Sequence, residues 1–161
     1  GQASSFRLLR DFQSKGDLTD YRTLVLGIFI PIVLRILSAI LTRGPEGLIF
    51  PWGNTFVPSN TAYFDKVEKT ADVGSRPAAV SWVGALDMSG NVWEWTSSLY
   101  QPYPYNADDG RENTSDTNSM RVLRGGGSYS FEYGVRAASR NWNNPDAKDA
   151  NKGFRCARAY N

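Results

Sequence analysis

The chain has 161 residues and a formal net charge of +2, so its length supports one domain with an appendage and its charge gives no argument for nucleic-acid binding. It contains no histidine and a single cysteine, which excludes an internal disulfide, a zinc cluster and a histidine general base. Five Trp, eight Tyr and eight Phe with fifteen Gly indicate a loop-rich domain held together by aromatic packing.

The N-terminal part divides into a basic segment, residues 1–22, and an apolar segment, residues 23–43. Residues 23–41 are apolar except for Thr23, Arg35 and Ser38, and about 19 such residues can cross a bilayer as a helix. We therefore predict a single transmembrane helix. The charge of Arg35 would have to reach the headgroups or a partner.

The bias of Lys and Arg around this segment predicts its orientation. The N-terminal side is the more basic, so we expect it to be cytoplasmic and residues 44–161 to be exoplasmic. Two alternatives remain open for the apolar segment. It could be a buried helix of a soluble domain, since a helix apolar on every face also occurs in deep cores, or an artefact of the sequence.

From residue 44 onward the chain is rich in turn residues. Residues 80–86 and 91–97 are predicted as short strands or packed loops, and residues 120–124 and 153–159 as strands. Residues 100–118 are polar and predict a long surface loop, and residues 141–152 a second loop.

The densest stretch of the chain is Leu-Asp-Met-Ser-Gly-Asn-Val-Trp-Glu-Trp at residues 86–95. Two carboxylates separated by Gly and Asn favour a turn that surrounds a hard cation such as Ca²⁺. The alternative is that Glu94 caps a turn or pairs with an arginine such as Arg124, with no metal. The indole rings of Trp93 and Trp95 are expected in the core.

Two other motifs suggest chemistry that the chain does not support. Arg-Gly-Gly-Gly-Ser at residues 124–128 lacks the Lys-Ser/Thr ending of a phosphate-binding loop. Cys156 has no histidine to activate its thiol, so we expect it to be buried and inert.

Four sequence motifs occur in a characteristic order: Phe-Pro-Trp-Gly-Asn at 50–54, the stretch at 86–95, the Arg-Gly-Gly-Gly-Ser turn at 124–128, and Gly-Phe-Arg-Cys-Ala-Arg at 153–158. Together they resemble the formylglycine-generating enzyme (sulfatase-modifying factor) family, from about residue 44 to residue 160. The resemblance implies an α+β, loop-rich, C-type-lectin-like domain, truncated at its N-terminal side and following the predicted membrane helix.

The resemblance also implies a structural Ca²⁺ site. Its ligands would be the side chains and backbone carbonyls at the matching positions Asp87, Gly90, Val92 and Glu94.

Activity is not implied. In the family, two upstream thiolates hold the copper ion that, with oxygen as the oxidant, oxidises a substrate cysteine. The position of one is Ala137 here, and the other falls near Glu132, so no copper and no catalytic residues are expected.

A partner-binding surface is the remaining prediction. Tyr, Trp, Ser and Asn provide contact area and hydrogen bonds at low entropic cost, and in the resembled fold the relevant segments lie near the peptide site. The predicted residues are Tyr129, Phe131, Glu132, Tyr133, Asn141, Trp142, Asn143 and Asn144. The alternative is that these aromatic rings only pack the fold and these amides only stabilise loops.

We therefore expect a non-catalytic, membrane-tethered binding or structural module. It would be an accessory subunit of an integral membrane complex or a domain that binds a peptide or protein. One alternative is a soluble ligand-binding member of the family with a buried N-terminal helix. Another is an enzyme of an unrecognised type, for which Asp108, Asp109 and Glu132 would be the best acids.

Overall fold

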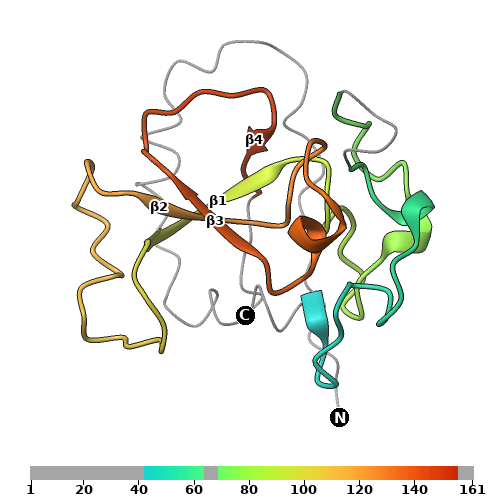
Figure 1. Cartoon of the computed structure of the whole chain (residues 1–161), viewed down its shortest axis with the longest axis horizontal. Helices are drawn as coiled ribbons and strands as arrows, with labels where there is room; N and C mark the ends of the chain where they lie inside the picture. Colours follow the sequence, from blue (N-terminus) through green and yellow to red (C-terminus); the bar gives the residue numbers. More distant parts are fainter. Residues whose placement is uncertain (1–41, 64–68, 156–161) are drawn as a thin grey trace, which may run out of the picture.

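The computed structural model of the chain describes residues 42–63 and 69–155. This part is built around one four-stranded sheet in the order β3-β2-β1-β4 (Figure 1). The strands are β1 (Trp93–Leu99), β2 (Arg121–Arg124), β3 (Arg140–Asn143) and β4 (Lys152–Gly153).

The sheet is mixed. Strand β2 pairs antiparallel with both β1 and β3, while β4 pairs parallel with β1. Glu94, Arg124 and Arg140 are in register across the three longer strands and therefore lie on one face of the sheet.

Outside the sheet the described chain is mostly loops, and it contains three short 3-10 helices, η1 (Pro58–Asn60), η2 (Pro77–Ala79) and η3 (Glu132–Val135). The first two begin with proline, whose fixed φ suits the first position of a helix and whose missing N–H is not needed there. The prediction of a loop-rich domain is confirmed.

The core is small and is built from alanines and a few larger side chains. Leu123 of β2 and Val135 of η3 are the most completely buried of its large side chains. Phe50 also belongs to the core, and its ring stacks on Trp52 at 5.3 Å between centroids and meets Phe56 at 5.5 Å. Aromatic packing therefore supplements a core that is short of large aliphatic residues.

The glycine-rich turn after β2 serves to bring backbones together. Gly126 has a φ of +78°, and a Cβ there would lie 2.7 Å from the carbonyl oxygen of Gly134. Only glycine fits both the left-handed backbone and the contact with η3.

One of the predicted elements is wrong in part. Residues 141–143, which the prediction placed in a loop, belong to strand β3. Arg-Asn-Trp-Asn has little intrinsic strand preference, but its pairing with the buried Val122 and Leu123 of β2 decides its conformation. For residues 80–86, predicted as a short strand or a packed loop, the structure has no strand. The predicted strand at 120–124 and the loop at 100–118 are confirmed, whereas β4 begins one residue earlier than predicted and ends at Gly153.

The predicted membrane segment, residues 23–41, and Cys156 lie outside the described residues. Within 42–63 and 69–155, no helix has both the length and the apolarity that crossing a bilayer requires.

Candidate functional site

The turn that was predicted to hold a cation leads directly into β1. Its backbone is left-handed at Asp87 (φ +56°), Gly90 (φ +86°) and Asn91 (φ +71°). The Asn91 side chain is bonded in both directions to the backbone of Ala71, and Asp87 Oδ2 accepts the N–H of Gly74 at 2.7 Å. These bonds hold the turn against the preceding loop, which explains how two non-glycine residues keep positive φ.

Arg155 closes this turn from the other side. Its Nε donates to Glu94 Oε1 at 2.6 Å, and its Nη2 forms an ion pair with the same oxygen. The two Nη groups donate to the carbonyls of Leu86 at 3.0 Å and Asp87 at 2.9 Å. Burial alone would lower the pKa of Arg155, but the charge of Glu94 raises it above its ordinary value.

The turn offers the oxygen donors that Ca²⁺ prefers, but part of Glu94 is already used. No three Asp, Glu, His or Cys side chains gather as a possible metal site in the part of the chain that the structure describes. A calcium ion here would therefore depend on backbone carbonyls as well as Asp87 and Glu94, with Arg155 competing for Glu94. The donor set fits in kind, and the calcium site stays a prediction.

Chelation tests it. If Ca²⁺ binds only the folded chain, a hundredfold excess over Kd stabilises by roughly 2.7 kcal/mol, so a chelator should lower the melting temperature. Asp87→Asn should abolish that response, and the control Asp72→Asn, at an exposed aspartate, should preserve it. If the melting curve ignores both chelator and added calcium, Arg155 alone closes the turn.

The first half of the predicted partner surface surrounds η3. Tyr129, Phe131 and Tyr133 are all exposed, as is Glu132. The rings of Phe131 and Tyr133 stack at 5.8 Å between centroids. Tyr133 is 63% exposed, the second largest exposure among the large hydrophobic side chains of the described chain.

Ala137 follows directly after η3. It is buried, and its amide donates to the carbonyl of Ile49 at 2.8 Å. The position where the resemblance expects a redox thiol therefore carries only a methyl group, held in place by the backbone.

The second half of the predicted surface is β3 with the residue after it. Asn141, Trp142 and Asn144 are exposed and Asn143 is half-buried. The Ser139 hydroxyl donates to the Tyr133 carbonyl at 2.6 Å, which ties the end of η3 to the start of β3. The aromatic rings of the two halves nevertheless make separate contacts, since Trp142 packs on Tyr100 at 5.7 Å.

Sequence reasoning missed three residues of this second half: Tyr100, Tyr103 and Arg140. The Arg140 guanidinium lies over both tyrosine rings, 4.4 Å from the centroid of Tyr100 and 4.5 Å from that of Tyr103. Partial burial by itself raises the pKa of Tyr103, but hydrogen bonding to Arg140 and the charge of Arg124 outweigh it, so the pKa lies below its ordinary value. No local pattern identifies these residues, because they come from different segments.

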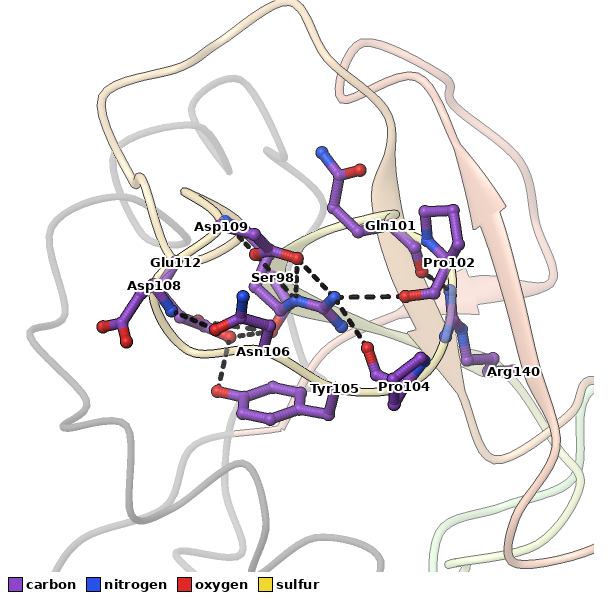
Figure 2. A network of polar contacts seen from close by, with 11 residues as sticks. Ser98, Gln101, Pro102, Pro104, Tyr105, Asn106, Asp108, Asp109, Glu112 and Arg140 are labelled. Carbon is purple, nitrogen blue, oxygen red and sulfur yellow. Dashed lines mark hydrogen bonds and ion pairs between the residues drawn. The ribbon is translucent and has the colours of Figure 1, made fainter.

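The long loop after β1 is held by buried arginines. Arg111 pairs with Asp109 and donates to the carbonyls of Pro102 at 3.1 Å and Pro104 at 3.4 Å (Figure 2). The hydrogen bond from Arg111 holds the pKa of Asp109 below its usual range. Arg121 is buried as well and donates to the carbonyl of Asn113 at 3.1 Å.

The three candidate acids lie in different surroundings. Asp109 is bound to Arg111 and anchors the loop, Asp108 is exposed beside it, and Glu132 lies on η3. Among the described residues, no hydrogen bond or ion pair joins Glu132 to either aspartate.

A family model and several curated relatives match the chain. The model of the sulfatase-modifying factor enzyme 1-like domain matches residues 39–160. The inactive C-alpha-formylglycine-generating enzyme 2 of Mus musculus is 36% identical over 130 residues, which cover 71% of this chain and 38% of the relative. The hercynine oxygenase of Mycolicibacterium smegmatis is 36% identical over 119 residues, which cover 67% of this chain and 27% of the relative. The chain therefore spans well under half the length of these relatives.

A solved structure is similar as well. Treponema denticola variable protein 1 superposes with a TM-score of 0.61 at 23% identity, covering 73% of this chain and 43% of that one. At this identity the likeness concerns the fold alone.

Proposed function

The chain belongs to the family of sulfatase-modifying factor enzyme 1-like domains, and from this membership we propose that it is a non-catalytic module that binds a protein partner. The observation that carries the proposal is the surface around η3. Exposed Tyr129, Phe131 and Tyr133 stand where, by resemblance, active members hold their peptide and their thiols, and Ala137 replaces one of those thiols.

The chemistry of that surface supports binding more than catalysis. Copper-dependent oxidation of a substrate cysteine needs two soft thiolate ligands, and the chain as given has only Cys156. Stacked, exposed aromatic rings instead provide rigid contact area with few rotatable bonds, which is typical of interface residues. A relative named as an inactive enzyme shows that loss of activity occurs within this family.

Membrane attachment through residues 23–41, with the domain exoplasmic, belongs to the same proposal. The attachment rests on the apolarity of residues 23–41, and the orientation on the excess of Lys and Arg in residues 1–22.

The enzyme alternative has its own support, because hercynine oxygenase is also a relative. We expect the protein to consume no oxygen above the blank with copper and a cysteine-containing peptide. The formylglycine-generating enzyme of Mus musculus, 31% identical over 132 residues, is the positive control. Turnover above the blank would overturn the non-catalytic reading.

Binding is tested separately by site-specific photo-crosslinking in native cells. A crosslinking amino acid at Tyr133 should capture a partner as a discrete product. The same amino acid at Val73 should not, although Val73 is similarly exposed (58% against 63%). Equal capture at both positions, or none at either, would contradict a partner surface at η3.

A further inference from the structure

The outer edge of β3 carries backbone donors that another strand could use. Among the described residues β3 pairs only with β2. On the other side, the Trp142 N–H donates to the side-chain oxygen of its neighbour Asn141 at 2.9 Å, and the Asn144 N–H to that of Asn143 at 2.8 Å. Such local caps protect an edge strand from indiscriminate pairing. An incoming carbonyl can replace each of them by an equivalent hydrogen bond.

Beside this edge lies a continuous row of side chains, ordered Tyr103, Arg140, Tyr100 and Trp142. Adjacent members are 4.5, 4.4 and 5.7 Å apart. Arg140 Nη2 also donates to the carbonyl of Gln101 at 2.6 Å, which fixes the row to the loop after β1. The row is assembled in advance, and its three aromatic members are exposed, so a ligand meets it at little entropic cost.

The charge at this edge is positive. Arg124 and Arg140 are neighbours in register, and neither forms an ion pair with a carboxylate of the described residues. Arg124 instead donates to the carbonyls of Ala138 and Ser139, and Arg140 Nε is buried without a hydrogen-bond partner. Exposed Arg136 adds a third positive charge nearby in the chain. An acidic ligand would supply the missing complement.

We propose that an extended acidic peptide segment of the partner adds to the outer edge of β3 as a further strand. Its carbonyls take the Trp142 and Asn144 N–H groups from the asparagine caps. Its side chains on one face contact the row from Tyr103 to Trp142, where a carboxylate meets Arg140 and an aromatic ring meets Trp142. This inference rests on the proposed binding function and names the chemistry of the ligand.

The first test needs no change to the protein. The probe is a fluorescein-labelled peptide, Thr-Glu-Thr-Tyr-Thr-Glu-Thr, titrated with the full chain by fluorescence anisotropy. An analogue with Lys for both Glu should bind at least about tenfold more weakly, because it repels the arginines. Two further analogues are N-methylated at alternate amides, in one or the other phase. A strand bonds through one edge only, so one phase should lose binding and the other should retain it.

The second test uses the edge itself. Asn144→Pro removes an outward donor that plays no part in the β2 ladder, and residues ahead of a proline prefer the extended backbone that β3 already has. It should weaken the Glu peptide about tenfold, while the control Asn144→Ala, which keeps the N–H, should not. Trp142→Ala should weaken it as well, and Trp82→Ala, at an exposed tryptophan in a different loop, should leave it unchanged.

Three results would overturn the inference. The first is that the peptide does not bind at millimolar concentration, and the second is that both methylated forms bind equally. The third is that the chain dimerises through β3, which would appear as a doubled mass that Asn144→Pro returns to that of the monomer. Each leaves the Tyr133 crosslink unaffected, so this inference can fail while the proposed function stands. If the crosslink at Tyr133 is lost while the peptide still binds, the proposal of a partner surface at η3 is overturned and the strand addition at β3 stands.

Discussion

Replacing Gly90 by alanine is expected to destabilise the domain by roughly 2–5 kcal/mol. A Cβ there would lie 1.9 Å from Thr61 Oγ1 and 2.6 Å from the carbonyl oxygen of Ala62. Thr61 cannot move aside easily, since it is 2% exposed and its hydroxyl donates to the carbonyl of Ser89 at 2.7 Å. Overpacking of 1–3 kcal/mol adds to the roughly 1–2 kcal/mol of the left-handed backbone, a large share of the stability of a small domain.

Gly110→Ala is the matched control. Gly110 has a similar φ of +80°, but nothing lies within 4 Å of the added Cβ. It should therefore show the backbone cost alone, about 1–2 kcal/mol. Urea unfolding, or the soluble yield where a variant fails to fold, measures both. Similar losses for the two variants would mean that Gly90 does not contact residues 61–62 as described.

Arg155→Met is expected to cost roughly 3–5 kcal/mol of unfolding free energy. The substitution leaves the carboxylate of Glu94 largely buried without its partner and removes the donors to the carbonyls of Leu86 and Asp87. Adding Glu94→Gln to Arg155→Met should recover part of the loss, since the unpaired charge is then gone. Thermal or urea unfolding of the two single variants and the double variant measures the coupling.

Arg124→Met tests the alternative that Glu94 pairs with Arg124 instead of Arg155. Arg124 is the cross-strand neighbour of Glu94, yet its guanidinium donates to the carbonyls of Ala138 and Ser139. We expect it to cost about 1 kcal/mol and to show no coupling with Glu94→Gln. Strong coupling between Arg124 and Glu94 would contradict the described ion pair.

Local sequence was sufficient for the features that depend on local conformation. Backbone preferences of the residues agree with the observed structure in the glycine-rich turn at 124–128, the strand at 120–124 and the loop at 100–118. The same holds for the exposure of the η3 aromatics, because each is flanked by turn and polar residues.

Pairing between distant segments is different. The arginine that closes the Asp87–Glu94 turn is Arg155, which is 61 positions from Glu94. The chain contains several other arginines that could have reached a carboxylate, Arg124 among them. Only the parallel pairing of β4 with β1, which places Gly153 opposite Glu94, brings Arg155 to the turn.

The sequence by itself determined the family of this domain, its loop-rich character, the residue types of its η3 surface and the absence of a thiol at Ala137. Each of these follows from residue identity or from short-range backbone preference. The tertiary structure decided which arginine pairs with Glu94, that residues 140–143 form an edge strand, and that Tyr103, Arg140, Tyr100 and Trp142 stack in one row. The physical reason is that packing between segments overrides weak local preference, and many residue pairs compete for each long-range contact.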